Sequence, residues 1–290
     1  MLNIVLNHAG PDDLRRKVLQ SGAILMYSAS GKSRALAELA KNMARQAFDG
    51  MDPEHAQESL PVEKFVAIVS ALKTQFTNGA QTKERLLAYL IEMGVDPELT
   101  YFDLPRLRVV PHSNYLSSGV SYAYKAHRDI WYASPTAQIN WWLPVWDVVP
   151  DRSMAFFPGY WDRPMPNSSE QFDYGEWVRV GRAAAVSQVG VDTRKHPLPL
   201  QELTPGDEFR FGAATGDAVL FSASHLHATV PNTTASTRFS IDFRTVNVMD
   251  LRNHRGGPNI DSRAQGSTLG DFLSVKDLRP LELTADLQAV

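Results

Sequence analysis

A histidine and an aspartate two residues apart, followed much later by another histidine, are the residues of this chain best placed to do chemistry. The pair is His127 and Asp129, the later histidine is His227, and Arg238 follows eleven residues after it. Two imidazoles and one carboxylate can hold Fe(II) on one face and leave the other positions open for a cosubstrate and O2. An arginine nearby can anchor a carboxylate through its planar fork. Together these residues suggest an enzyme that activates oxygen.

Each of these residues also has a plainer interpretation. A lone His-x-Asp pair occurs by chance, and Asp129 could be a surface residue or the ion-pair partner of Arg128. In an extended segment, however, residues two apart point to the same side, so His127 and Asp129 could reach one ion. His225 lies two residues before His227 and competes with it for the third ligand position. Its plainer role is a hydrogen-bonded core histidine.

The segment 238–244 alternates strictly between polar and apolar residues. Arg238, Ser240, Asp242 and Arg244 share one face, and phenylalanine or isoleucine occupies the other, which is typical of a strand with one face on the core. If the polar face lines a pocket, Arg238 and Ser240 can bind the same carboxylate. The alternative is a solvated face of an edge strand.

A second alternating segment covers residues 138–146 and places Gln138, Asn140 and Trp142 on one side. An amide such as Asn140 beside a metal can donate a hydrogen bond to a bound cosubstrate. Equally, amide and tryptophan side chains can simply fill the interior of a barrel. For the tryptophans that second interpretation is the better one.

The composition of the 290 residues is that of an ordinary globular protein, with a net charge of −3 and a pI near 6.2. Nothing in it favours a nucleic-acid or membrane partner. The absence of cysteine excludes disulfides, thiolate metal ligands and cysteine catalysis. The N-terminus has no basic region ahead of an apolar run, and no stretch reaches the roughly 20 apolar residues needed to span a bilayer. We therefore expect a cytoplasmic protein that acts, as a monomer or homodimer, on a small molecule.

Hydrophobic periodicity divides the chain into a helical first part and a strand-rich second part. Helices are expected at 12–19, at 33–47 with Ser33 as the cap, at 62–76 and at 82–93. After Pro105, short runs rich in β-branched and aromatic residues predict strands at 107–111, 121–125, 138–145, 154–157, 218–221, 228–230 and 238–246. We expect one domain, in which residues 1–104 support a β core at 105–250 and residues 251–290 form a loop-like tail.

A long polar insert at 160–205 interrupts the predicted strands. It carries Trp161, Phe172, Tyr174 and Trp177, which are many aromatic residues for an idle loop. Long loops in compact domains are usually functional or mobile. The insert is expected to form either a lid over a substrate or an interface, and both interpretations stay open.

Four segments resemble the Fe(II)/2-oxoglutarate dioxygenases, specifically their phytanoyl-CoA dioxygenase-like branch. The likeness spans roughly residues 105–248, and the segments that carry it are 125–132, 142–150 with 157–159, 216–221, and 227–232 with Arg238. The last of these segments identifies His227, rather than His225, as the third metal ligand. The Arg-x-Ser pair of Arg238 and Ser240 is similar to the pair that binds 2-oxoglutarate in related oxygenases.

The resemblance implies a double-stranded β-helix, also called a jelly roll or cupin-like fold, which is mainly β with N-terminal helices against one sheet. It implies Fe(II) on His127, Asp129 and His227, with 2-oxoglutarate and O2 as cosubstrates and with Arg238, Ser240 and Asn140 binding the 2-oxoglutarate. The implied reaction is hydroxylation of an unactivated C–H of a small molecule, such as a secondary metabolite, with succinate and CO2 as coproducts. Halogenases resembling this family have Gly or Ala in place of Asp129, so an aspartate there favours hydroxylation.

Other functions remain open at this point. The same cofactors support desaturation or cyclisation, an Fe(II) oxygenase could work without 2-oxoglutarate, and a jelly roll could bind ligands without catalysis. The sequence does not name the substrate. Trp131, Arg163 and the long insert are where contacts with it are expected.

Overall fold

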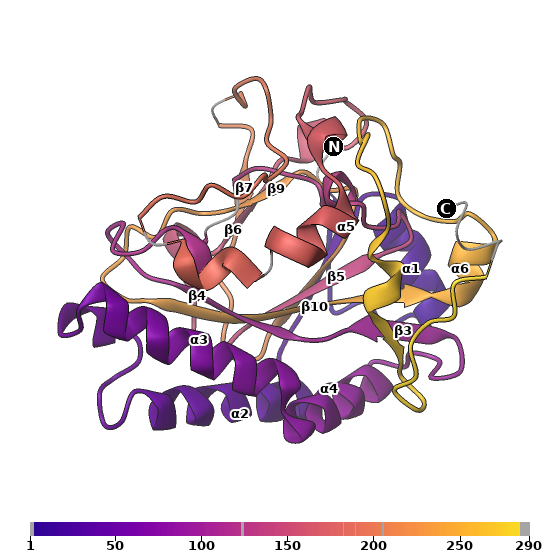
Figure 1. Cartoon of the computed structure of the whole chain (residues 1–290). Coiled ribbons are helices and arrows are strands. Elements are labelled where there is room, and N and C mark those ends of the chain that lie inside the picture. Colours follow the sequence, from indigo (N-terminus) through magenta and orange to yellow (C-terminus); the bar gives the residue numbers. More distant parts are fainter. Residues whose placement is uncertain (1–2, 123–124, 182, 189, 205, 285–290) are drawn as a thin grey trace.

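The structure is a computed structural model that describes residues 3–122, 125–181, 183–188, 190–204 and 206–284 (Figure 1). The four predicted helices are present: α1 (Asp12–Gln20), α2 (Gly31–Ala47), α3 (Val62–Asn78) and α4 (Ala80–Glu92). The cap of α2 is Ser30 rather than Ser33. The Ser30 side chain accepts from the Ser33 backbone, and the Ser33 side chain accepts from Ser30 N–H, which forms a reciprocal capping box.

A large sheet forms the centre of the molecule, in the order β1-β2-β8-β5-β10-β3-β11, with β4 also paired to β10. Its strands are β1 (Asn3–Leu6), β2 (Ala23–Tyr27), β3 (Thr100–Asp103), β4 (Arg106–Val110), β5 (Ile139–Pro144), β8 (Ala218–Ser222), β10 (Arg238–Asn247) and β11 (Phe272–Ser274). β10 is antiparallel to β5 on one side and to β4 and then β3 on the other. This central position makes it the strand that organises both faces.

Helices α2, α3 and α4 lie against one face of the large sheet (Figure 1). Phe239, Ile241 and Phe243 of β10 point to that side and are at most 1% exposed. They join Trp141 and Leu143 of β5 in the main core. Burying such side chains contributes about 1.5–3 kcal/mol each. The predicted alternation of β10 is therefore confirmed, and its polar residues must face the other way.

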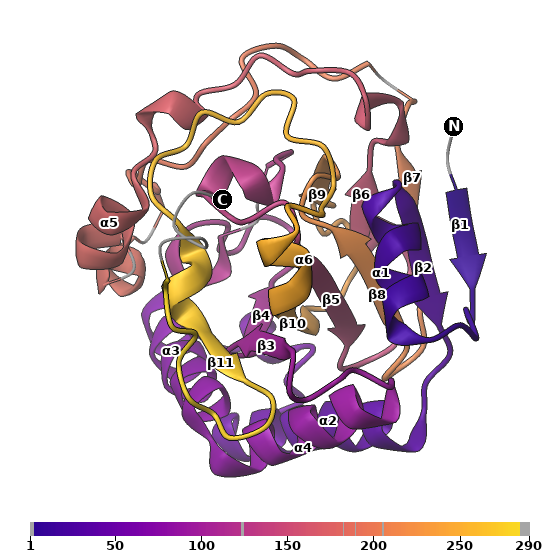
Figure 2. The same cartoon turned by 90° about the vertical axis from the view of Figure 1, so that its right-hand side faces the viewer.

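A small sheet lies on that other side, in the order β7 (Phe209–Arg210), β6 (Met154–Phe156) and β9 (His227–Thr229). Trp142 and Phe221 of the large sheet pack with Phe156 and Phe211 in one apolar cluster. The two sheets thus face each other, and a cavity lined by β5, β10, β6 and β9 lies between them. The insert and the tail arch over the same side (Figure 2).

The structure corrects several predicted elements. The helical first part also supplies β1, β2 and β3, because its short apolar runs complete the sheet; Ile24 and Leu25 of β2 are fully buried. The strand predicted at 121–125 is absent from the described residues, where a 3-10 turn (Gly119–Ser121) is found instead, and residues 123–124 lie outside them. The tail contains α6 (Val248–Arg252) and β11 as well as loops.

Among the described residues of the insert, the helical elements are short turns, and an isolated β-bridge joins Asn167 to Pro199. The turns include a 3-10 turn (Ser169–Gln171), α5 (Tyr174–Glu176) and a π-helical turn (Trp177–Gly181) that continues α5. Among the described residues, no helix is both long and apolar enough to cross a membrane.

Candidate metal centre

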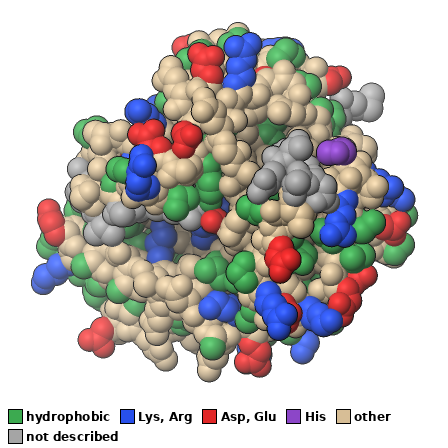
Figure 3. Space-filling model, turned by 45° about the vertical axis from the view of Figure 1, so that its right-hand side comes forward, with side chains coloured by type: hydrophobic (Ala, Val, Ile, Leu, Met, Phe, Trp, Pro, Cys, Tyr) green, Lys and Arg blue, Asp and Glu red, His purple; other side chains and the backbone are tan. Residues whose placement is uncertain are grey.

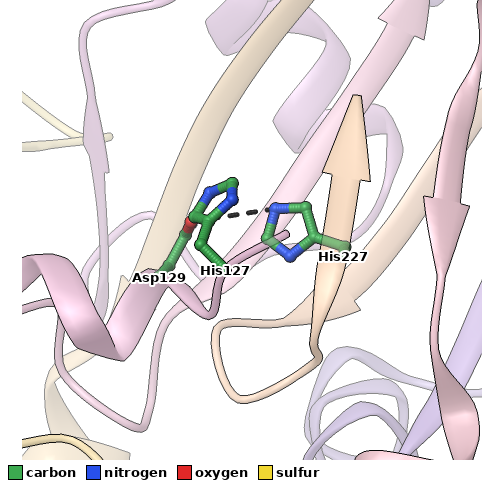
Figure 4. A group of neighbouring side chains, drawn as sticks. All are labelled: His127, Asp129 and His227. Carbon is green, nitrogen blue, oxygen red and sulfur yellow. Dashed lines mark ion pairs between the residues drawn. The ribbon is translucent and has the colours of Figure 1, made fainter. Parts of the chain in front are cut away.

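His127, Asp129 and His227 converge on one point, as the sequence predicted (Figure 4). One ligand atom of each lies within 4.8 Å of the other two. Asp129 Oδ1 is 3.3 Å from His127 Nε2 and 3.9 Å from His227 Nε2. All three side chains are buried, with at most 6% of each residue exposed. Two imidazoles and a carboxylate in this arrangement could hold a metal ion, and their chemistry suits iron.

Backbone pairing brings the two histidines together. His127 and His227 form an isolated antiparallel bridge with hydrogen bonds of 2.9 and 3.0 Å in the two directions. Asp129 begins a 3-10 turn (Asp129–Tyr132), and its N–H donates to Ala223 O. A one-hundred-residue separation in sequence therefore becomes direct contact through main-chain hydrogen bonds.

The orientation of both rings is also fixed from behind. His127 Nδ1 lies 2.8 Å from Lys125 O, and His227 Nδ1 lies 3.0 Å from His225 O. Because a carbonyl oxygen only accepts, each Nδ1 carries the hydrogen and each Nε2 presents a lone pair toward the centre. This is the tautomer that a metal ligand requires.

The electrostatics favour the same protonation states. Burial, with a contribution from neighbouring His127, lowers the pKa of His227 to about 3, so its imidazole is neutral. Burial alone would raise the pKa of Asp129, but its close contacts with His127 and His227 outweigh burial and lower that pKa. Asp129 is therefore a carboxylate, as a metal ligand must be.

The second oxygen of Asp129 has its own partners. Gln138 Nε2 donates to Oδ2 at 3.1 Å and also to Asn140 Oδ1 at 2.8 Å. Arg244 Nε lies 3.6 Å from the same Oδ2, while its Nη1 is 2.8 Å from Asp103. These contacts leave Oδ1 as the oxygen that faces the two histidines.

His225 points away from this centre. Its Nε2 lies 3.1 Å from Gly22 O, and its ring packs against that of Trp161 at a tilt of 42°, with 4.5 Å between centroids. Burial lowers its pKa to about 4, so it is a neutral core histidine. The geometry thus places His227, not His225, beside His127 and Asp129.

The centre opens into a cavity of about 290 Å³ between the two sheets. Figure 3 shows a hollow on one face of the molecule, with basic side chains deep inside it. Asn140 and Arg238 line this cavity together with the three converging residues. Ser240 lies on the same face of β10 and is fully buried, but it does not line the cavity.

Arg238 is a buried cation for which the described residues provide no ion-pair partner. It is 3% exposed, and its Nη1 donates to Ser153 O at 2.6 Å. Its Nε has no hydrogen-bond partner among the described residues, and the same holds for Ser240 Oγ and Asn140 Nδ2. Burial, followed by the charge of Arg108, lowers the pKa of Arg238 to about 10. Unsatisfied buried donors of this kind call for a bound anion.

Trp131 and Arg163, the expected substrate contacts, do not line the cavity. Trp131 is fully buried, and its Nε1 donates to Asp261 at 2.7 Å. Arg163 lies over the ring of Tyr160, 4.1 Å from its centroid. Trp131 belongs to a buried apolar cluster with Ile130 and Tyr160, a placement that its neighbours in the sequence do not reveal.

Seven more side chains that line the cavity beyond the centre are aromatic or charged, and they come from both ends of the segment before β5, from the insert and from the tail: Tyr122, Tyr132, Phe172, Tyr174, Trp177, Arg194 and Asp271. The aromatic content of the insert was a usable signal for three of them, and the family likeness of residues 125–132 included Tyr132. No pattern in the sequence singled out Tyr122, Arg194 or Asp271.

No protein-family model and no curated protein matches this sequence. Several solved structures resemble it in fold at low identity. One is EvdO2 from Micromonospora carbonacea var. aurantiaca complexed with 2-oxoglutarate: 13% identity, TM-score 0.46, 82% of this chain and 92% of that chain covered. Another is the epimerase SnoN with Fe3+, alpha ketoglutarate and nogalamycin RO. Its identity is 16% and its TM-score 0.43, and the match covers 81% of this chain and 85% of that chain. A third is the non-heme alpha ketoglutarate dependent carbocyclase SnoK. Its identity is 12% and its TM-score 0.39, and the match covers 91% of this chain and 96% of that chain. Their TM-scores are below 0.5, so these likenesses alone do not establish a family.

Proposed function

We propose that this protein is an Fe(II)/2-oxoglutarate-dependent oxygenase that hydroxylates a C–H of a small molecule. One observation carries the proposal: a buried His-Asp-His cluster lines the same cavity as a buried arginine for which the described residues provide no carboxylate partner. The first can hold a metal ion, and the second can hold the far carboxylate of a dicarboxylic cosubstrate. The phytanoyl-CoA dioxygenase-like branch and the jelly-roll core, with its two facing sheets, are part of the same proposal.

The metal would be held by His127 Nε2, His227 Nε2 and one oxygen of Asp129. When bound, Fe(II) with 2-oxoglutarate and O2 supplies an oxidant strong enough to attack a C–H bond. The protein's own contribution is to orient both imidazoles through carbonyls behind them and to hold Asp129 through Gln138. Because Asp129 fills the carboxylate position, hydroxylation is favoured over halogenation.

Arg238 would bind the distal carboxylate of 2-oxoglutarate. Its Nη1 is held by Ser153 O, which fixes the guanidinium and leaves Nε without a partner in the described chain. Asn140 would add a donor at the metal end of the cosubstrate through Nδ2. Ser240 would support Arg238 only after a small movement, since its hydroxyl is buried outside the cavity lining.

Anaerobic titrations test this proposal directly. The protein should bind about one Fe(II), and 2-oxoglutarate should bind only when the metal is present, with the visible absorption band of their complex as the signal. On exposure to air, the loaded protein should release succinate, slowly without a substrate and faster with a metabolite extract that contains one. Binding of Fe(II) without any binding of 2-oxoglutarate would refute the cosubstrate and leave an Fe(II) oxygenase of another kind.

Matched histidine variants identify the ligands. His127→Ala and His227→Ala should each lose Fe(II) binding, whereas His225→Ala should keep it, because His225 faces Gly22. Loss of metal in His225→Ala with retention in His227→Ala would overturn the assignment. A fold without catalysis, the remaining alternative, predicts no succinate from any of these proteins.

A further inference from the structure

An aromatic wall begins at the metal centre and runs outward along the cavity. The ring of Tyr132 meets the ring of His127 edge-on at 5.3 Å, and Phe172 lies 5.2 Å beyond Tyr132. Trp177 follows at 5.8 Å from Phe172. All of these side chains line the cavity. A molecule that enters the cavity toward the metal therefore passes along aromatic faces and edges.

Arg194 is held beside this wall by a carboxylate. Its guanidinium lies 5.4 Å from the ring centroid of Trp177 and 5.8 Å from that of Tyr122, and its Nε donates to Asp192 at 2.8 Å. Tyr122, Phe172 and Arg194 also line a neighbouring cavity of about 530 Å³. The wall thus continues into a second space, where part of a larger molecule could extend.

The floor of the cavity is polar but its charges are paired. Arg108 donates to both oxygens of Asp242 at 2.7 and 3.1 Å. Arg106 and Arg244 both contact Asp103, at 2.7 and 2.8 Å. Arg244 Nε also lies 3.6 Å from Asp129 Oδ2, so these three arginines face three carboxylates and present hydrogen-bonding groups whose charges are matched in number.

The cavity therefore contains one arginine for which the described residues offer no carboxylate, Arg238, and 2-oxoglutarate would occupy it. A carboxylate on the substrate would have to compete with Asp242, Asp103 or Asp129 for one of these arginines and so weaken an ion pair that already exists. An uncharged molecule meets no such penalty. Flat or ring-shaped apolar surfaces gain most from contact with Trp177 and Tyr132.

We propose that the substrate is an uncharged, ring-bearing compound with polar substituents, one ring of which packs against Trp177 and Tyr132 while its polar groups meet the paired arginines. This inference rests on the proposed function, because it assigns Arg238 to the cosubstrate. It makes Trp177 a specificity-determining residue for the substrate.

Two fluorescent probes of matched shape test the inference: uncharged 7-methoxycoumarin and its anionic 4-acetate derivative. Each is titrated into the full-length protein loaded with Mn(II) and 2-oxoglutarate, where Mn(II) replaces iron to prevent turnover. We expect the uncharged probe to bind at least tenfold more tightly. Equal or tighter binding of the acetate, or no binding of either probe, would overturn the inference.

Variants of two tryptophans from the same insert show where the probe binds. Trp177→Ala should weaken binding of the uncharged probe about tenfold, and Trp177→Phe should restore most of it, because a ring face is regained. Trp161→Ala is the control, since Trp161 packs against His225 and does not line the cavity. Equal weakening by Trp161→Ala and Trp177→Ala would contradict the proposed site.

Binding of 2-oxoglutarate to the same samples, measured by calorimetry, separates the two proposals. If Trp177→Ala keeps normal 2-oxoglutarate affinity while losing the probe, both proposals are supported. If the wild type binds 2-oxoglutarate but prefers the anionic probe, only the substrate class is refuted. If it does not bind 2-oxoglutarate at all, the proposed function fails, and the assignment of Arg238 to the cosubstrate fails with it.

Discussion

Replacing Arg238 by methionine separates what this residue does for cosubstrate binding from what it does for folding. Methionine has a similar length and no charge. In the metal-free protein Arg238 is a buried cation, and burial with the neighbouring Arg108 lowers its pKa from the usual range of arginine to about 10. At about 1.4 kcal/mol per pKa unit, keeping this group charged costs the folded state about 3 kcal/mol.

The substitution removes this cost, but it also removes a hydrogen bond. Arg238 Nη1 donates to Ser153 O at 2.6 Å, and a hydrogen bond from a charged group contributes about 1.5–3 kcal/mol. Ser153 O keeps a second donor, Val230 N–H at 3.1 Å, so it does not become unsatisfied. The two effects nearly cancel. The free energy of unfolding of metal-free Arg238→Met should therefore stay within about 1 kcal/mol of the wild type in urea titrations.

Binding of 2-oxoglutarate should respond very differently. A bidentate contact with its carboxylate contains two charge-assisted hydrogen bonds, together about 3 kcal/mol or more, which corresponds to at least about 100-fold in affinity. Arg238→Lys keeps the charge but loses the fork, so about tenfold is expected. Calorimetry with Mn(II)-loaded protein measures both. Arg152→Met is the control, because Arg152 pairs with Glu54 and does not line the cavity.

Unchanged 2-oxoglutarate affinity in Arg238→Met would refute this reasoning. The next candidate would then be Arg244, although its Nη1 already contacts Asp103. A loss of more than about 3 kcal/mol of unfolding free energy in the metal-free variant would also refute it, because Arg238 would then be a structural residue instead of a binding residue kept at the expense of stability.

Three further predictions concern the support of the site. Asp129→Ala should abolish Fe(II) binding while leaving the fold intact by circular dichroism. Gln138→Leu removes only the donor to Asp129 Oδ2, so it should weaken Fe(II) binding about 10-fold or more without abolishing it. Asp261→Ala should lower the free energy of unfolding by about 3–5 kcal/mol in urea titrations, because it leaves the fully buried Arg128 without its carboxylate; a change under 1 kcal/mol would contradict the buried pair. Burial lowers the pKa of His196 from 6.5 to about 4, so the unfolded chain takes up this proton at a higher pH than the folded protein does. The free energy of unfolding should therefore fall as the pH drops from 6.5 toward 4, by at most about 1.4 kcal/mol per pH unit. In His196→Gln this decline should be shallower.

Local patterns in the sequence predicted the parts of the site that one segment defines. The period-two alternation of residues 238–244 placed Arg238 on the polar face and Phe239 in the core, and both placements are confirmed because a strand leaves no other choice. The spacing of His127 and Asp129 likewise allowed both to reach one point. Choosing His227 over His225 needed the family likeness, because either could face the centre in an extended segment. The bridge between His127 and His227 is the contact that decides it.

Local sequence patterns could not predict the contacts between distant segments. β1 and β2 are short apolar runs among helices, and they join the sheet only because β2 pairs with β8 and β1 pairs with β2. Trp131 and Trp177 are both aromatic residues near polar ones, yet the first is buried on Asp261 and the second lines the cavity. Their burial depends on where the insert and the tail cross the loop at 122–132, which no periodicity encodes.

Arg128 shows how one short segment serves both chemistry and folding. It stands between two residues that face the centre, and its own side chain points the opposite way, into the protein. There it contacts Asp261 of the tail, Tyr160 O and Arg163 O of the insert, and Ser224 O of the loop before β9. The carbonyls and carboxylate it joins come from the three segments that surround the centre. Because side chains alternate along this segment, His127 and Asp129 face the centre while Arg128 points to the opposite side. There Arg128 hydrogen-bonds to the tail, the insert and the loop before β9 and so links them, which means that the same three residues set the geometry of the site and support it.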